Sequence, residues 1–166
     1  MKLAVTFFLL STLAFAQSGQ PKQRFVCNSG YTAEQCHKEM NVVREILAKY
    51  HADWLGDWTW VLVKSNDWKP LLEKVGRDPD SPAFSVLEQR ETFFEEALFE
   101  KNAVRSAELL MTWQMPLDRL TVLAVTHELG HALCIDSNEA RASHRAEELQ
   151  GGKLPSCGKE VMRAGR

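Results

Sequence analysis

The most informative stretch of this sequence is LDRLTVLAVTHELGHAL, which runs from Leu117 to Leu133. Its apolar residues would surround most of a helix, which predicts a helix buried in the core. His127 and His131 are four residues apart, so both imidazoles lie on one face of that helix. Glu128 follows the first histidine directly. Burying these three side chains without partners would cost several kcal/mol, so the stretch predicts that they have one.

A metal ion is the partner that this spacing favours. Two imidazole nitrogens one helical turn apart can bind one zinc ion at about 2.0–2.1 Å. Glu128 would then lie beside a zinc-activated water, where a carboxylate can accept a proton and pass it to a leaving amine. The alternative is a pair of hydrogen-bonded core histidines with no metal.

The motif His127-Glu-Leu-Gly-His131 resembles that of the zincin metallopeptidases, over about Asp118 to Leu149. The resemblance implies a compact single-domain α+β fold in which a small sheet packs on the active-site helix. It also implies a peptide or protein substrate, hydrolysed by a water on one zinc ion with Glu128 as general base. In that arrangement Thr92 to Phe99 is the expected edge strand, to which a substrate adds as a further strand.

The third metal ligand separates the zincin subfamilies. Metzincins carry Gly and His three and six residues after the second histidine, where this chain has Cys134 and Ser137, and the Gly-Thr-x-Asp pattern of aspzincins is absent. Gluzincins take a glutamate from the following helix, so the resemblance implies a small gluzincin-like member with Glu139 as third ligand. Small residues on the Glu139 face would let the two helices approach closely; these are Ala142, Ser143 and Ala146.

Other residues compete for these roles. Asp136 lies on the turn after the motif helix and is an alternative third ligand. Cys134 shares the histidine face but lies about 10 Å along the axis from His127, and a disulfide suits it better. A residue that stabilises the oxyanion is also needed; the candidates are Arg141, His144 and Arg145, and none is assigned.

The N-terminus predicts export. Lys2 is followed by an apolar run from Leu3 to Leu13 and by a small-x-small cleavage site at Ala14-Phe15-Ala16, as in a secretory signal peptide. We therefore expect a signal peptide at residues 1–16, a zincin-like domain at residues 17–166, and a secreted or periplasmic protein.

The four cysteines agree with export, because an even count in an exported chain indicates two disulfides. Three pairings are possible. We favour the pairing by sequence order, which joins Cys27 to Cys36 and Cys134 to Cys157.

The net charge of −2 over 166 residues is near neutral. It comes without a basic patch, so we expect neither a nucleic-acid partner nor a membrane partner once the signal peptide is removed. No oligomeric state is predicted.

Periodicity and turn residues predict the remaining elements. We expect a frayed segment from Gln17 to Arg24, and a helix from Ala33 to Tyr50 that Thr32 and Gln35 cap. Strands are expected at Trp58–Val63, Phe84–Leu87 and Thr92–Phe99, and helices from Asn66 or Asp67 to Val75, at Ala103–Trp113 and at Glu139–Leu149.

Two functions outside the enzyme class remain open. One is a metal-binding but non-catalytic module that docks a partner through an exposed strand edge. The other is a disulfide-stabilised binding domain without a metal.

Overall fold

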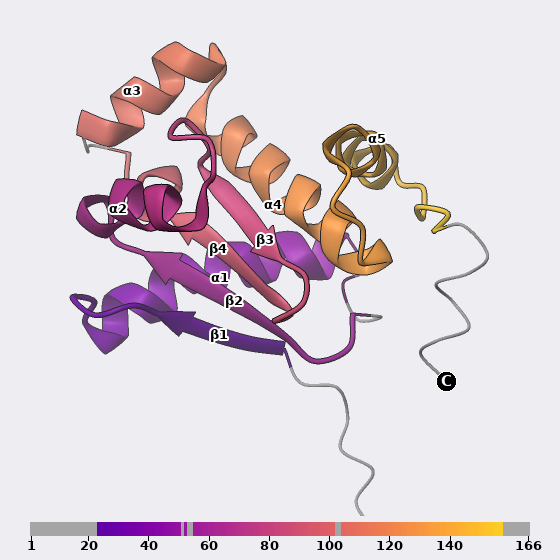
Figure 1. The fold of residues 1–166 in the computed structure, drawn as a ribbon, viewed down its shortest axis with the longest axis horizontal. Coiled ribbons are helices and arrows are strands. Elements are labelled where there is room, and N and C mark those ends of the chain that lie inside the picture. The colour runs from indigo at the N-terminus through magenta and orange to yellow at the C-terminus, as the bar shows by residue number, and fades with distance from the viewer. Residues whose placement is uncertain (1–22, 51, 53–54, 102–103, 158–166) are drawn as a thin grey trace, which may run out of the picture.

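The computed structural model describes residues 23–50, 52, 55–101 and 104–157 (Figure 1). These residues form one α+β domain, with a four-stranded sheet and five α-helices. The expected signal peptide at residues 1–16 lies outside the described residues. In chain order the elements are β1 (Gln23–Cys27), α1 (Ala33–Lys49), β2 (Trp58–Val63), α2 (Ser65–Val75), β3 (Ala83–Val86), β4 (Glu91–Glu95), η2 (Glu96–Leu98), α3 (Val104–Trp113), α4 (Leu117–Cys134) and α5 (Glu139–Gln150).

The sheet has the strand order β1-β2-β4-β3. β1, β2 and β4 run parallel, and β3 pairs with β4 in the antiparallel direction. β3 is therefore an edge strand, and it packs beside α4. The opposite edge is β1.

The prediction of Thr92 to Phe99 as the edge strand is wrong. Only Glu91–Glu95 forms a strand, and the 3₁₀ helix η2 follows it. β4 lies between β2 and β3. It pairs with β2 along one edge, and the short turn between β3 and β4 brings β3 against its other edge. Alternation of side chains indicates that a segment is a strand, but it does not say which neighbours the strand takes.

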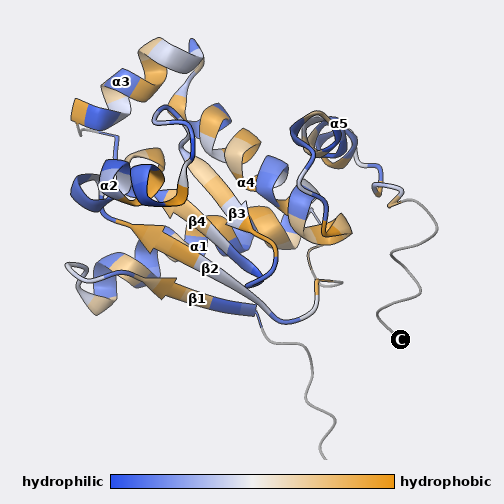
Figure 2. Cartoon of the chain, in the orientation of Figure 1, coloured by the Kyte–Doolittle hydropathy of each residue, from blue (hydrophilic) through white to orange (hydrophobic). Residues whose placement is uncertain are grey.

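Alternate residues of β2 point into two separate apolar cores. Trp58, Trp60 and Leu62 pack with α1 and α4 on one face of the sheet, whereas Val63 packs with Trp68 of α2 on the other. Figure 2 shows apolar colour along much of the sheet, while α5, farther from the sheet, is mostly hydrophilic.

α4 is the helix that the sequence predicts, longer by one residue. Buried residues lie all round it, from Leu117 and Leu120 to Ala132 and Cys134. It packs against β3, α1 and α5, and it lies between the sheet and α5 in Figure 1. This position explains why its sequence carries no single apolar stripe.

The first strand begins inside the segment that was expected to be frayed, Gln17 to Arg24. Gln23 and Arg24 are not frayed, because β1 begins at Gln23 and pairs with β2. The Gln23 side chain donates to the carbonyl oxygen of Ala52 at 2.6 Å and accepts from Nε1 of Trp60 at 3.2 Å. Polar residues at an edge strand carry little periodic signal, so the strand was missed. The capping box of Thr32 and Gln35 at the start of α1 is confirmed.

Both favoured disulfides are present. Cys27–Cys36 joins the end of β1 to α1, and Cys134–Cys157 ties the C-terminal segment to the end of α4. Such bridges are typical of proteins that fold in an oxidising compartment. Within the described part of the chain, no helix combines the length and the apolar character needed to cross a bilayer.

Candidate metal centre

His127 and His131 project from one face of α4, as their spacing predicts. Their ring centroids are 4.9 Å apart, and their Nε2 atoms are 3.2 Å apart. His131 is buried and His127 is half-buried. Both imidazoles thus turn the same nitrogen toward one point.

Glu139 reaches this point from α5. α4 ends at Cys134, and the next residue, Ile135, has a left-handed backbone (φ 46°) that reverses the chain. Asn138 caps α5 by accepting from the backbone N–H of Arg141. Glu139 is the first residue of α5, so the short turn delivers its carboxylate beside both histidines. The loop between the helices is as short as the sequence suggests.

The two helices approach closely because the residues between them are small. A Cβ added to Gly130 would stand 2.8 Å from the carbonyl oxygen of Ala142 and 3.2 Å from Cβ of Arg145. Ala142 and Ala146 are fully buried in this contact. The expectation that small side chains permit close approach is confirmed here, with Gly130 as a further member.

The three ligand atoms form a compact triangle. Oε2 of Glu139 lies 2.9 Å from Nε2 of His127 and 3.3 Å from Nε2 of His131. Ligands about 2.0–2.1 Å from a tetrahedral zinc ion are themselves about 3.3 Å apart, so the triangle fits one face of such a site. His127, His131 and Glu139 could therefore hold a metal ion.

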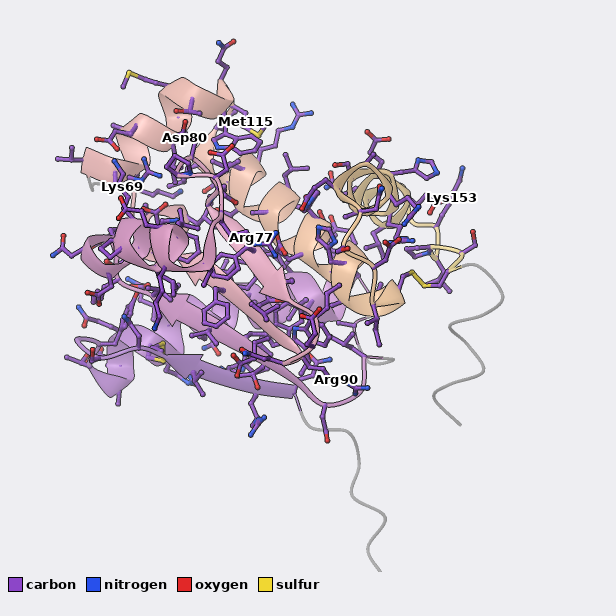
Figure 3. All side chains as sticks on the ribbon, viewed as in Figure 1. Lys69, Arg77, Asp80, Arg90, Met115 and Lys153 are labelled. Carbon is purple, nitrogen blue, oxygen red and sulfur yellow. A yellow bond between two sulfur atoms is a disulfide. The ribbon has the colours of Figure 1, made fainter. Side chains whose placement is uncertain are left out.

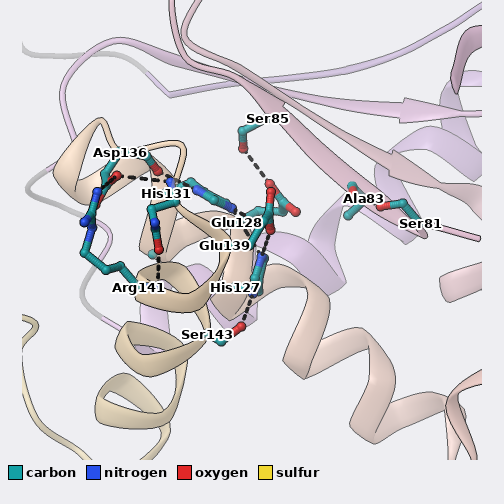
Figure 4. A network of polar contacts seen from close by, with 12 residues as sticks. Ser81, Ala83, Ser85, His127, Glu128, His131, Asp136, Glu139, Arg141 and Ser143 are labelled. Atoms are coloured by element: carbon teal, nitrogen blue, oxygen red, sulfur yellow. Dashed lines mark hydrogen bonds and ion pairs between the residues drawn. The ribbon is translucent and has the colours of Figure 1, made fainter. Parts of the chain in front are cut away.

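The Nδ1 atoms of the two histidines, which face away from the triangle, also have hydrogen-bond partners. Nδ1 of His131 lies 2.5 Å from the backbone carbonyl oxygen of Asp136, which can only accept, so this nitrogen carries the hydrogen. The Nε2 lone pair of a neutral His131 then points at the centre of the triangle. Nδ1 of His127 lies 3.3 Å from Oγ of Ser143, a residue on the Glu139 face of α5 (Figure 4).

Asp136, the alternative third ligand, is engaged elsewhere. Its carboxylate accepts from Arg141 at 2.6 and 2.8 Å and from Arg145 at 2.8 Å. The hydrogen bonds from Arg141, followed by those from Arg145, hold the pKa of Asp136 well below its usual range despite partial burial. Cys134, the other alternative, is in a disulfide. The two arginines thus fix the turn between the helices.

Glu139 itself favours the ionised form. Partial burial raises its pKa, but the hydrogen bond from His127 and the charges of both histidines outweigh burial, so the pKa lies below its ordinary value. An ionised carboxylate is the form that binds a metal.

Glu128 lies beside the triangle but does not belong to it. Its side chain is buried, and Oε2 accepts a hydrogen bond of 2.7 Å from Oγ of Ser85 on β3. Burial raises the pKa of Glu128, and the charge of His127 and the bond from Ser85 only partly offset this. A buried carboxyl with a raised pKa is suited to taking and releasing a proton.

A cleft of about 540 Å³ contains all four of these side chains. β3 and the turn at residues 77–82 form one wall, and α4 forms the other with Leu120, Leu123 and Ala124. Trp113, at the end of α3, also lines it. The candidate metal centre therefore opens into a cleft with an edge strand along one side.

Two side chains of the 77–82 turn occupy the outer edge of β3. Nη2 of Arg77 donates to the carbonyl oxygen of Ser85 at 3.1 Å, and Oγ of Ser81 donates to that of Ala83 at 2.5 Å. These carbonyls belong to residues two apart, and they point away from β4. Arg77 is one of the side chains labelled in Figure 3.

The three candidates for oxyanion stabilisation are placed elsewhere. Arg141 and Arg145 bind Asp136, and Arg145 also donates to the carbonyl oxygen of Gly130. His144 is exposed, with Nε2 3.7 Å from Glu148.

Sequence reasoning missed Ser85, Ser143 and Arg77 as residues of the site. Ser85 had a faint signal, since a hydroxyl stands among apolar residues of a predicted strand. Ser143 was seen only as a small residue, and Arg77 carried no signal, because its contact depends on the path of a turn.

The chain matches no known protein-family model, and no curated protein or solved structure is significantly similar to it.

Proposed function

We propose that this chain is a secreted or periplasmic zinc-dependent peptidase. One zinc ion is held by His127, His131 and Glu139, and Glu128 is the general base. The observation that carries the proposal is the position of Glu128, next to a His-His-Glu triangle of tetrahedral dimensions in a cleft bounded by an edge strand. Two imidazoles and one carboxylate are a donor set that zinc prefers in hydrolases.

When bound, zinc would supply Lewis acidity that polarises a carbonyl and lowers the pKa of water. The side chains of this protein supply the rest. Oε2 of Glu128 is held by Ser85, so Oε1 is the oxygen left to take a proton from the attacking water and return it to the leaving nitrogen. Burial of Glu128 favours this exchange because it brings the two protonation states closer in energy.

The edge strand supports a peptide as substrate. β3 has its inner groups bonded to β4, which leaves the outward groups of Ala83 and Ser85 facing the cleft. An extended peptide main chain can pair with such an edge and lie across the metal centre. Arg77 and Ser81 would have to leave the two carbonyls as the peptide binds.

Reversible removal of the metal tests this proposal. Purified protein with intact disulfides should cleave a mixed peptide library. Cleavage should stop after dialysis against a chelator and return when zinc is added. A chelator already saturated with zinc is the control and should have no effect. Cleavage that continues in metal-free protein would rule out the zinc mechanism.

A second candidate is a metal-binding module that docks a partner through β3 without hydrolysis. The observation that favours it is that Arg141, Arg145 and His144 all have other partners, so none of these three meets a developing oxyanion. This candidate predicts bound zinc without cleavage of any peptide in the library.

A further inference from the structure

A row of buried polar groups runs from Glu128 across β3 and β4 to β2, on the face of the sheet that packs against α4. Nε1 of Trp58 lies 3.0 Å from Oγ1 of Thr92, which lies 2.7 Å from Oγ of Ser85, which lies 2.7 Å from Oε2 of Glu128. The four residues come from β2, β4, β3 and α4 in turn. None of the first three is a metal ligand.

The row is enclosed by the core. Thr92 is fully buried, Trp58 is 2% exposed and Ser85 is 7% exposed. Ser85 and Thr92 are opposite each other in the antiparallel β3–β4 pair. Their neighbours on the same face, such as Trp60 and Phe94, are apolar. Two hydroxyls in such a place need partners, and here each has two.

The hydrogens that these four side chains carry fix the direction of donation along the row. An indole N–H can only donate, so Thr92 accepts from Trp58. An ionised Glu128 can only accept, so Ser85 uses its single hydrogen on Oε2. The remaining bond must then run from the hydroxyl of Thr92 to the oxygen of Ser85. All three hydrogens point toward Glu128, and bonds in such a chain strengthen one another.

We propose that Ser85, backed by Thr92 and Trp58, is a positioning residue that holds Oε2 of Glu128 and thereby presents Oε1 to the reacting water. The inference rests on the proposed function and deepens it. Ser85 acts through Glu128 and does not touch the substrate with its side chain, whose hydroxyl points into the core.

Kinetics of Ser85→Ala give the first test. Loss of the bond frees the carboxylate to rotate, so kcat should fall roughly 10- to 100-fold, as when the support of a catalytic group is removed. KM and zinc content should stay near wild type. A kcat within about twofold of wild type, in protein that cleaves peptides, would overturn the inference.

Thr92 offers a matched pair of variants. Thr92→Val keeps the shape and removes the hydroxyl, whereas Thr92→Ser keeps the hydroxyl and removes a methyl group. The positioning role predicts that Thr92→Val lowers kcat and that Thr92→Ser nearly retains it, even though the methyl cavity lowers stability. A purely structural role predicts that kcat follows stability instead. Thermal unfolding of both variants separates the two accounts.

A readout independent of catalysis is the indole N–H resonance of Trp58 in the protein as purified, assigned with Trp58→Phe. Ser85→Ala and Glu128→Gln should each move it upfield, because both weaken the chain that ends at this proton. His144→Gln, on exposed α5 surface, should leave it in place. An unchanged resonance in both variants overturns the inference. Absence of peptide cleavage by the wild type overturns the proposed function alone, since the resonance still reports whether the chain reaches Glu128.

Discussion

Glu139 is the residue that adds a third candidate ligand to the pair of histidines on α4. It comes from a different helix and carries the largest share of exposed surface among the three ligands. Its pKa lies below the ordinary value, so it is available as an anion at neutral pH.

Replacing Glu139 by alanine should weaken zinc binding at least about 100-fold, because a tetrahedral site loses one of three protein ligands. Competition with a chromophoric chelator measures this. Glu147→Ala, an exposed change on the same helix, is the control and should bind as wild type. Equal affinity in both variants would remove Glu139 from the centre.

Glu39 on α1 predicts a pH dependence of stability away from the site. Burial, followed by the negative charge of Glu96, raises the pKa of Glu39 to about 7, although Lys64 lowers it. The folded state thus holds the proton more tightly than the unfolded state. The associated stability is present at low pH and is lost as pH rises from the unfolded value near 4.5 to about 7.

Glu39→Gln should therefore stabilise the protein by about 1 kcal/mol at about pH 8, after allowance for solvent screening, and should change little at about pH 4. Denaturant unfolding at both pH values measures the difference. Glu45→Gln, exposed on the same helix, is the matched control. A gain that is equal at both pH values would contradict the assigned cause.

At the scale of elements, the α4–α5 contact decides where Glu139 lies. Gly130→Ala places a methyl group 2.8 Å from the carbonyl oxygen of Ala142, so the helices must separate. We expect a loss of about 1–3 kcal/mol in unfolding free energy, together with weaker zinc binding.

Gly56→Ala is the control for this change, because its new Cβ would meet only the end of the Arg90 side chain, at 3.4 Å. Thermal unfolding and zinc titration of the two variants give the comparison. Wild-type zinc affinity in Gly130→Ala would mean that helix spacing does not set the site.

The turn before β3 is the element that a substrate has to move. Arg77 donates to the carbonyl of Ser85, which a pairing peptide would need. If this bond competes with substrate, Arg77→Met should lower KM about three- to tenfold, the net value of one typical hydrogen bond, with kcat unchanged. Lys74→Met, a change of an exposed residue on α2, is the control and should leave KM at the wild-type value. A raised KM would instead mean that Arg77 binds the substrate.

Elements with strong local signals were predictable from sequence. β2 has the predicted limits, α4 is longer by one residue, and the Thr32 cap and the Glu139 position agree with expectation. These depend on periodicity and short-range spacing. The edge position of β3 and the start of β1 were not predictable, because strand order depends on pairings between distant segments.

At the scale of the whole molecule, the sheet joins the parts of the site that lie far apart in sequence. Ser85 and Glu128 are separated by 43 residues, and Trp58 and Thr92 by 34. The three candidate ligands fall within 13 positions of one another (127–139), and the sequence indicated the histidines by their spacing and Glu139 by the family resemblance. The residues that support Glu128 required the folded sheet.

The disulfide Cys134–Cys157 lies close to the candidate metal centre. Cys134–Cys157 fixes the end of α4, next to the turn that carries Asp136 and leads to Glu139. A preformed turn reduces the order that metal binding has to impose.

The most direct test of the central claim combines zinc content and peptide cleavage. Wild type and Glu128→Gln are purified without chelators or nickel resin and assayed side by side. The account predicts one zinc ion per chain in both proteins and peptide hydrolysis in the wild type only. Wild-type protein without zinc, or full hydrolysis by Glu128→Gln, would contradict it.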